Sequence, residues 1–220
     1  MNGTATMIKE FHDAGVFPKP NVILCVPFHL LSCGGNAQDC SVHTEGAFTG
    51  EVSAKMIRDM GAKYCIVGHS ERRQNFGETS EFVAKKATRC LENGLIPIIC
   101  VGETLAERES GGTLKIIEDQ VWQSIPNTSE IKGEVIVAYE PVWAIGTGLI
   151  PVVSDIEKVH NHIKDVLGKM GIADTAVVYG GSVSPDNAAE IMGTQNVDGV
   201  LVGGASLSIE KFKGIIDARG

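Results

Sequence analysis

Two polar segments of the 220-residue chain carry side chains suited to proton transfer. The first is residues 68–73, Gly-His-Ser-Glu-Arg-Arg, which follow an apolar run. A histidine between a strand and a helix has its pKa lowered by the positive end of the helix, so His69 could act as a neutral hydrogen-bond donor. The alternative is a loop histidine that caps a backbone group, and the local sequence does not decide between the two.

The second segment is residues 139–148, in which Glu140 comes at the end of an apolar run. An unpaired carboxylate is costly to bury at such a position, which favours a chemical role. Pro141 to Trp143 form a stiff start to the following loop, and small residues continue up to Gly148, a pattern typical of a hinged lid. A structural ion pair on a surface loop is the alternative, but it does not explain a tryptophan beside so many glycines.

Two pairs of glycines form the third set of candidate residues. Gly180-Gly181 and Gly203-Gly204 follow the last two apolar runs of the chain. Backbone N–H groups at strand ends, with a helix N-terminus behind them, form an anion site suited to phosphate. Paired glycines also occur in simple turns, but two pairs after consecutive strands favour a phosphate site.

These residues must be positioned by short apolar runs that alternate with longer amphipathic stretches. The predicted strands are residues 22–26, 64–67, 97–101, 135–139, 176–179 and 200–202, with part of another strand within 33–38. The predicted helices are residues 4–14, 53–60, 79–93, 113–125, 154–170, 187–192 and 209–218. The helix over 154–170 is expected to begin with a capping box formed by Ser154 and Glu157. Continuous apolar strands separated by helices are typical of an α/β fold with a parallel sheet.

The glycines distinguish between two α/β architectures. A doubly wound sheet usually carries its phosphate-binding glycines at the first strand–helix turn, as G-x-G-x-x-G. Here they follow the last two strands, where a barrel places its phosphate site. No linker or change of composition divides the chain, so we expect a single barrel domain over residues 1–220.

Charge and hydropathy exclude two classes of partner. The chain has 27 acidic and 19 basic residues, a net charge of -8 and no long run of like charges, which argues against a nucleic-acid partner. No long uninterrupted apolar window occurs, and Lys9, Glu10 and Asp13 occupy the segment where a signal peptide would be apolar. We therefore expect a cytoplasmic protein with no membrane partner.

The six cysteines lie far apart in the sequence and form no C-x-x-C pair. They are Cys25, Cys33, Cys40, Cys65, Cys90 and Cys100. We expect reduced, mostly buried thiols rather than a disulfide or zinc framework, and we expect no metal ion.

The candidate segments together resemble the triosephosphate isomerase family. The matching stretches are residues 46–51, 67–73, 138–148, 179–183 and 198–206, which run in the family's order. The resemblance implies a (β/α)₈ TIM barrel. It also implies interconversion of dihydroxyacetone phosphate and D-glyceraldehyde 3-phosphate through an enediol, in glycolysis and gluconeogenesis, with no cofactor.

The resemblance further implies a role for each site residue. Glu140 would be the base that moves a proton between two carbons, and His69 would be the neutral imidazole that polarises the carbonyl. Glu71 would support this centre, and Cys100 would pack near the base. The backbone N–H groups that would hold the phosphate are those of Gly146, Ser182, Gly203 and Gly204. Thr49 and Gln38 would lie at the contact with the neighbouring subunit of a homodimer.

The chain departs from the family's pattern at its start. The family's first strand ends in an Asn-x-Lys motif directly before Met-Asn-Gly, whereas this chain begins at Met1-Asn2-Gly3. We therefore expect that strand, with its substrate-binding asparagine and catalytic lysine, to be absent. Lys9 and Lys19 cannot substitute, because one lies in the first predicted helix and the other between two prolines. Losing such an electrostatic group typically costs ~10²-fold or more in rate.

A second departure follows Pro27. Residues 28–35 are too few for both the helix and the strand that the family has there, since a crossover needs about 10–12 residues. We expect the second helix to be absent and the sheet to have seven strands. An open sheet leaves exposed edges, so we expect the 220 residues to be an incomplete stretch of a normal enzyme. The alternative is a catalytically impaired barrel that only binds phosphorylated metabolites. Glu140 together with His69 argues against a different phosphate-binding barrel enzyme.

Overall fold

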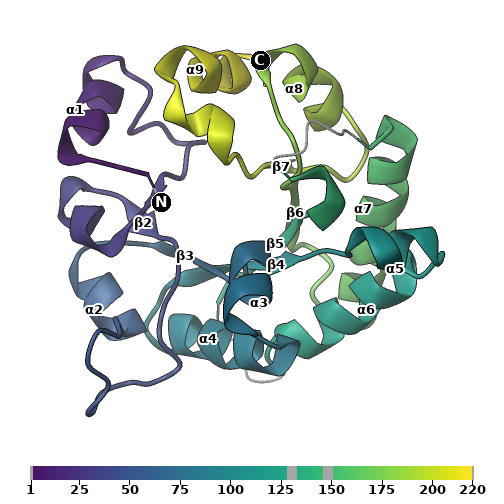
Figure 1. Cartoon of the computed structure of the whole chain (residues 1–220), viewed down its shortest axis with the longest axis horizontal. Coiled ribbons are helices and arrows are strands. Elements are labelled where there is room, and N and C mark those ends of the chain that lie inside the picture. The colour runs from purple at the N-terminus through teal and green to yellow at the C-terminus, as the bar shows by residue number, and fades with distance from the viewer. Residues whose placement is uncertain (1, 128–132, 146–150, 220) are drawn as a thin grey trace.

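The computed structural model describes residues 2–127, 133–145 and 151–219. Within these ranges the strands form one parallel seven-stranded sheet, whose strand order β1-β2-β3-β4-β5-β6-β7 follows the order in the sequence. The sheet curls around a central axis and the helices surround it (Figure 1). The fold is therefore the α/β TIM barrel type expected from the alternating pattern.

The strands are longest in the middle of the sheet and shortest at its two edges. They are β1 (Cys25–Val26), β2 (Asn36–Ala37), β3 (Tyr64–Val67), β4 (Ile96–Val101), β5 (Ile136–Tyr139), β6 (Ala176–Tyr179) and β7 (Gly199–Val200). All were predicted within a few residues, including the short β2 inside residues 33–38. Because the strands are parallel and in sequence order, their carboxyl ends meet at one face of the molecule.

Helices cover the outside of the sheet. They are α1 (Ala5–Asp13), α2 (Ala54–Asp59), α3 (Ser70–Phe76), α4 (Ser80–Glu92), α5 (Leu105–Glu109), α6 (Thr113–Ser124), α7 (Val153–Lys169), α8 (Pro185–Met192) and α9 (Ile209–Asp217). Short 3₁₀ helices are η1 (Phe28–Cys33), η2 (Val142–Ala144) and η3 (Gly204–Leu207). In the described part of the chain, no helix has both the length and the apolar character needed to cross a membrane. The short α3 and α5 were not predicted as helices, because five to seven residues give too little periodicity.

The predicted capping box at Ser154 is wrong. Helix α7 begins at Val153 after Val152, whose side chain makes no capping hydrogen bond. The helix therefore starts one residue earlier than predicted, and Ser154 lies inside its first turn instead of at the capping position.

Each strand buries two faces, and β3 illustrates the alternation. Tyr64 and Ile66 pack with the residues that fill the inside of the barrel, whereas Cys65 and Val67 are completely buried between the sheet and the helices. Burying one large apolar side chain contributes about 1.5–3 kcal/mol, so these two layers hold the strand ends in place. The loops that leave the carboxyl ends can then carry the chemistry.

Two elements of the barrel were expected to be absent, the helix between β1 and β2 and the strand between β7 and β1. Between β1 and β2 the chain forms only the six-residue η1, so the prediction that the second helix is absent is confirmed. Strands β1 and β7 form no ladder with each other within the described ranges. The helix layer nevertheless continues past this position, because Phe11 of α1 and Phe212 of α9 pack edge to face with ring centroids 5.8 Å apart.

Candidate active site

His69 lies at the carboxyl end of β3, where it caps α3. Gly68 before it has φ of 68°, and a Cβ at this position would lie 2.6 Å from Val83 Cγ2, so the turn requires glycine. The backbone N–H of Glu71 donates to His69 Nδ1 at 3.3 Å. An accepting Nδ1 leaves the proton of a neutral ring on Nε2, which faces the centre of the site.

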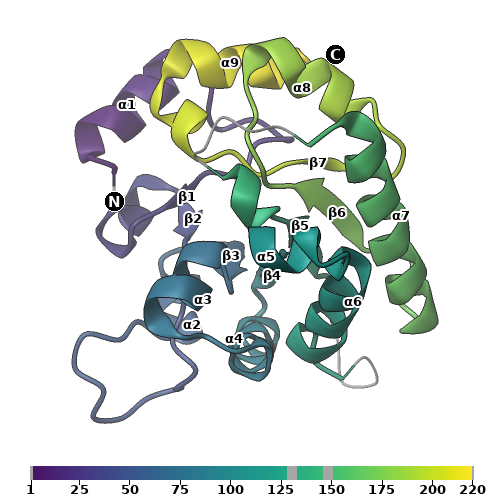
Figure 2. The same cartoon turned by 45° about the vertical axis from the view of Figure 1, so that its right-hand side comes forward.

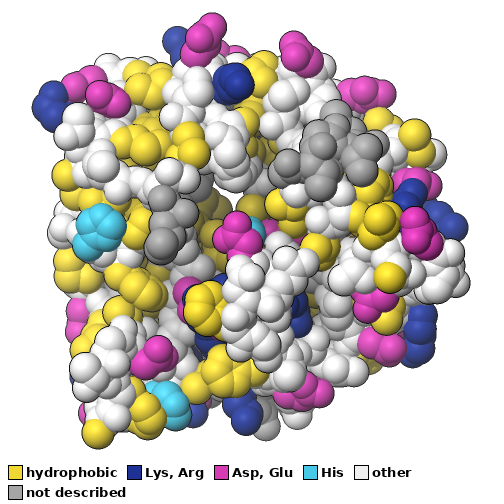
Figure 3. Space-filling view, viewed as in Figure 1, with side chains coloured by type: hydrophobic (Ala, Val, Ile, Leu, Met, Phe, Trp, Pro, Cys, Tyr) yellow, Lys and Arg dark blue, Asp and Glu magenta, His cyan; other side chains and the backbone are white. Residues whose placement is uncertain are grey.

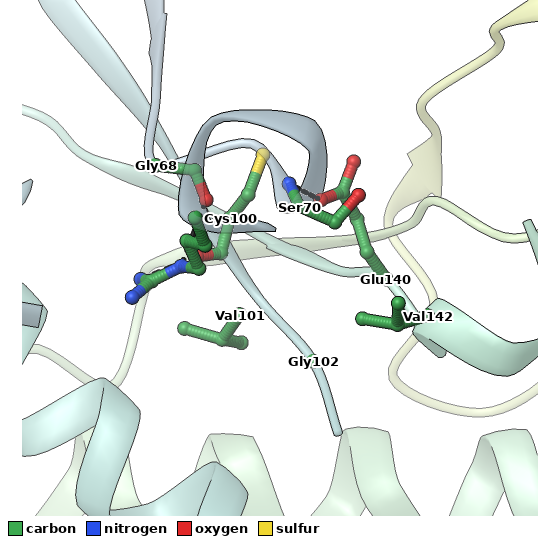
Figure 4. A pocket seen from close by; sticks show the side chains of 8 residues that line it. Gly68, Ser70, Cys100, Val101, Gly102, Glu140 and Val142 are labelled. Carbon is green, nitrogen blue, oxygen red and sulfur yellow. Dashed lines mark hydrogen bonds between the residues drawn. The ribbon is translucent and has the colours of Figure 1, made fainter. Parts of the chain in front are cut away.

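Glu140 lies at the carboxyl end of β5 and is 1% exposed. Its Oε2 accepts a hydrogen bond of 2.9 Å from the backbone N–H of Ser70, as Figure 4 shows. Its Oε1 lies 3.0 Å from His69 Nε2, but the ring N–H is not aligned with it, and Oε1 has no hydrogen-bond partner among the described residues. The structure thus brings together the predicted base, Glu140, and the predicted hydrogen-bond donor, His69, and it leaves one oxygen of the carboxylate without a hydrogen bond among the described residues.

Two glycines allow the ends of neighbouring strands to approach Glu140. A Cβ on Gly102, after β4, would collide with the carbonyl oxygen of Glu140. A Cβ on Gly180, after β6, would lie 2.8 Å from Glu140 Cγ. Gly102 and Gly180 therefore provide the space that the backbone and the side chain of Glu140 occupy.

The predicted direction of the His69 pKa is wrong for this structure. Burial lowers the pKa, but the close contact with the negatively charged carboxylate of Glu140, with a smaller contribution from Glu71, outweighs it and the pKa is raised. The prediction considered only the helix that follows His69. The carboxylate that raises the pKa comes from β5, far from His69 in the sequence.

Cys100 lies at the end of β4 and shares a small cavity with Glu140 and Ser70 (Figure 4). The cavity has a volume of about 10 Å³, enough for about one water molecule and too small for a substrate. Burial and the nearby charge of Glu140 raise the pKa of the Cys100 thiol. Cys100 therefore packs beside the carboxylate as a neutral thiol.

The face above these residues is hollowed at its centre (Figure 3). Acidic and histidine side chains gather at the hollow, and apolar side chains surround it. The open space at this face, unlike the small cavity beneath Glu140, is where a ligand can reach the strand ends.

Comparisons with known proteins agree with this geometry. The sequence model of the family described as triosephosphate isomerase matches residues 3–219. This chain belongs to the triosephosphate isomerase family. The triosephosphate isomerase of Ruegeria pomeroyi is 52% identical over 242 aligned residues, which cover 99% of this chain and 93% of the relative. That of Jannaschia sp. is 48% identical, with 99% and 94% covered.

A solved structure extends the likeness to three dimensions. The crystal structure of triosephosphate isomerase from Bartonella henselae has a TM-score of 0.89 and 36% sequence identity, and the match covers 99% of this chain and 94% of that one. The alignment with the Ruegeria pomeroyi isomerase is longer than the 220 residues of this chain. The relative therefore has residues inside the aligned range without a counterpart here, which agrees with the short η1 connection.

Within the isomerase site, Glu71 lies at the edge. Its side chain is 77% exposed, and its Oε2 lies 3.9 Å from His69 Nδ1. At this distance and exposure the charge is screened by water, so only a weak influence on His69 follows. The supporting role of Glu71 stays a prediction.

The predicted phosphate-binding residues lie at the ends of β6 and β7. Gly203 and Gly204 are exposed, and open space surrounds the position of a Cβ at both. Their backbone N–H groups donate no hydrogen bond within the described part of the chain. Ser182 donates its hydroxyl to the carbonyl of Ala144 at 2.6 Å, which ties this loop to η2. Gly146 lies outside the described residues.

Two charged residues beside the candidate site, the partly buried Arg73 and the buried Glu103, were missed by the sequence analysis. Arg73 donates from Nε to the carbonyl of Gly68 at 2.9 Å and from Nη2 to that of Cys100 at 3.0 Å, which joins the ends of β3 and β4. Its place in the same segment as His69 was the available signal.

Glu103 is the second missed residue. It is fully buried, and its Oε1 accepts hydrogen bonds from Trp143 Nε1 at 2.9 Å and Tyr139 Oη at 3.2 Å. Burial raises the pKa of Glu103, and these hydrogen bonds oppose the increase. Glu103 fixes Trp143 at the start of the predicted lid, and an acidic residue directly after Gly102 was the signal for it.

The two residues predicted at a subunit contact lie on the β2 side of the barrel. Thr49 is exposed on the segment that extends away from the barrel between β2 and α2, seen at the lower left of Figure 2. On the same segment Phe48 is 42% exposed and stacks on His43 with ring centroids 3.5 Å apart. Gln38 donates from Nε2 to the carbonyl of Cys25 at 3.2 Å.

Proposed function

We propose that this chain interconverts dihydroxyacetone phosphate and D-glyceraldehyde 3-phosphate. The observation that carries the proposal is the pair of Glu140 Oε1 and His69 Nε2, 3.0 Å apart at the strand ends, with the carboxylate buried and contacted by no lysine or arginine among the described residues. Membership of the triosephosphate isomerase family supports it. A buried base beside a hydrogen-bond donor suits proton abstraction next to a carbonyl.

The reaction moves one proton between adjacent carbons. Glu140 removes a proton from the carbon next to the substrate carbonyl, and the electron pair of that C–H bond forms the carbon–carbon double bond of the enediolate. The N–H of His69 Nε2 donates to the carbonyl oxygen as negative charge develops there. The proton of the adjacent hydroxyl group moves to the former carbonyl oxygen, and the proton on Glu140 returns to the neighbouring carbon as the other oxygen becomes the new carbonyl. Atoms and electrons therefore balance within the substrate.

Substrate must separate the two side chains, because they lie in contact without it. Once the carbonyl oxygen takes the place of Glu140 Oε1 beside Nε2, the contact that raises the His69 pKa is lost. Burial and the start of α3 then favour the neutral imidazole. The site thus converts His69 into the neutral donor that the reaction uses.

The phosphate of the substrate is expected at the ends of β6 and β7. We assign it to the backbone N–H groups of Gly146, Ser182, Gly203 and Gly204, supported by the exposed, unbonded N–H groups of the last two. Backbone donors at this edge of a parallel barrel hold phosphate without a cofactor.

The assembly is proposed to be a homodimer in the cytoplasm. The extended segment with Thr49 and the exposed ring of Phe48 support a contact between subunits, with Gln38 at its base. Sedimentation of the parent and of Thr49→Arg tests this. A dimer that becomes monomeric in the variant supports the proposal, and a parent that sediments as a monomer overturns it.

An assay coupled to a dehydrogenase tests the reaction, with D₂O as solvent in a parallel run. We expect turnover of both triose phosphates, incorporation of deuterium at the exchanged carbon, and loss of both in Glu140→Gln. The second candidate is a barrel that only binds phosphorylated metabolites. It is favoured by the observation that, among the described residues, no lysine contacts Glu140 or His69. Binding of a phosphorylated enediolate mimic without turnover or exchange would establish that candidate instead.

A further inference from the structure

Three cysteine side chains from three different elements meet between the sheet and the helix layer. Cys40 follows β2, Cys65 lies on β3 and Cys90 lies in the last turn of α4. Their sulfur atoms all lie within 4.8 Å of one another, and the Sγ atoms of Cys40 and Cys90 are 3.6 Å apart. All three are at most 2% exposed, and all are free thiols.

The spacing of the sulfurs matches that needed around one metal ion. A metal–thiolate bond is about 2.3 Å long, so three sulfurs around one ion in a plane lie about 4 Å apart. In the cluster the Sγ atoms of Cys40 and Cys90 are 3.6 Å apart, and no two of the three sulfurs are more than 4.8 Å apart. Small side-chain rotations would therefore place the three sulfurs around an ion without movement of the strands or of α4.

The donor set selects the kind of ion. The ligands are sulfur only, and within the described residues no carboxylate or imidazole joins the three cysteines to complete a fourth position. Zinc strongly prefers four ligands in a structural site. Soft thiolate ligands favour Cu(I), which accepts three sulfurs. The burial of the cluster leaves little access for a water molecule to act as the fourth ligand.

We propose that Cys40, Cys65 and Cys90 form a three-sulfur binding site for a soft, thiophilic metal ion of the Cu(I) class. Binding replaces the S–H protons with bonds from sulfur to the metal and releases those protons to solvent. The ion keeps its oxidation state, so no oxidant or reductant takes part. The proposal does not depend on the isomerase activity.

The site is separate from the catalytic centre although both use β3. Cys65 points to the helix side of the sheet, whereas His69 lies beyond the carboxyl end of the same strand. The three ligands come from elements far apart in the sequence, which is why the absence of a C-x-x-C pair led to the expectation of no metal ion. The structure changes that expectation because the ligands are brought together only by packing of β2, β3 and α4.

A competition titration tests the site. The full chain, reduced with a phosphine under argon, receives Cu(I) from a chromophoric chelator, and sulfur-to-copper charge-transfer absorption in the ultraviolet is followed. We expect one Cu(I) per chain in the parent. Affinity is expected to fall at least ~100-fold in the double variant Cys65→Val with Cys90→Ala, because each lost ligand weakens a three-sulfur site. Cys33→Ser, which removes a thiol outside the cluster, is the matched control and should bind as the parent does.

Two results would overturn the proposal: a parent that binds no more Cu(I) than the double variant, or equal loss of binding in Cys33→Ser. Isomerase activity of both variants checks that they fold, since neither changes the catalytic centre. If the double variant fails to fold, X-ray absorption of the Cu(I)-loaded parent decides the matter. Three sulfur neighbours at about 2.3 Å support the site, and nitrogen or oxygen neighbours overturn it.

Discussion

Glu140 and Glu78 are both buried carboxylates, yet their surroundings differ in charge. Glu78 is 7% exposed, and its Oε1 lies 2.7 Å from Lys86 Nζ and 2.6 Å from Arg72 Nε. Glu140 is 1% exposed, and it contacts a backbone N–H and the ring of His69 instead of a fixed cation. A buried carboxylate can therefore be held either by fixed cations or by polar groups that leave it reactive.

The difference explains which carboxylate can exchange a proton. Protonation of Glu78 would remove the charge of one of the two carboxylates that Lys86 and Arg72 share and leave Asp39 as the other, which is costly beside the buried ammonium of Lys86. Glu140 can take up a proton without breaking an ion pair to lysine or arginine among the described residues. We infer that Glu78 holds the structure around α3 and α4, whereas Glu140 carries out the chemistry.

The largest effect is expected from Glu140→Gln. The amide keeps the shape and can still accept from Ser70, but it cannot remove a proton, so kcat should fall by about 10²–10⁴-fold. Thermal unfolding should change little. The exposed Glu109→Gln is the control and should keep the parent kcat. Equal turnover in Glu140→Gln and the parent would remove Glu140 as the base.

Lys86→Met should have the opposite effect to Glu140→Gln, with a loss of stability and little change in kcat. The buried ammonium contacts Glu78 at 2.7 Å and Asp39 at 2.6 Å, so its removal leaves the two carboxylates to share Arg72 Nε, which lies 2.6 Å from Glu78 and 2.8 Å from Asp39. Removing one partner of a buried pair typically costs about 3–5 kcal/mol. Denaturant unfolding should report this loss, while kcat per folded molecule stays near that of the parent. The exposed Lys115→Met serves as the control. A large fall in kcat with unchanged stability would contradict the distinction between the two carboxylates.

His69→Gln should reduce kcat by about 10²-fold, because a donor to the developing oxyanion is lost. The exposed His12→Gln, on α1, is the matched control. Since Glu140 remains in the variant, slow deuterium exchange into substrate should persist. Complete loss of binding of a phosphorylated enediolate mimic would instead indicate that His69 serves to bind substrate.

The expected pH dependence follows from the contact between Glu140 and His69, the two side chains proposed to act on the substrate. The pKa of His69 is raised above its usual 6.5, so the stability from its protonated form is full below pH 6.5 and is lost as pH rises through the raised value. Since catalysis needs the neutral ring, kcat/KM should fall as pH decreases through that same value, which lies above 6.5. An NMR titration should find a lower His69 pKa in Glu140→Gln than in the parent. The same pKa in both proteins would refute the role given to Glu140.

More of the fold than of the side-chain contacts between distant elements could be predicted from the sequence. The strands were found because apolar runs such as residues 97–101 mark them directly, and Glu140 was found because it ends such a run. The raised pKa of His69 could not be found, since the side chain responsible belongs to another strand. The Cys40, Cys65 and Cys90 cluster could not be found either, because its members share no local pattern. Local periodicity identifies helices and strands, whereas the pKa of a side chain and the grouping of metal ligands depend on which helices and strands pack together.

Glu71→Gln should give the smallest effect and tests how far the influence of charge on His69 extends. Glu71 is mostly exposed and 3.9 Å from His69 Nδ1, whereas Glu140 is buried and 3.0 Å from Nε2. Exposed charge pairs are typically worth about 0–1 kcal/mol, so kcat should change by less than about fivefold. The His69 pKa should fall, but less than in Glu140→Gln, and raised salt should abolish the difference from the parent. A fall in kcat as large as that of His69→Gln, insensitive to salt, would instead place Glu71 among the groups that act on the reacting atoms.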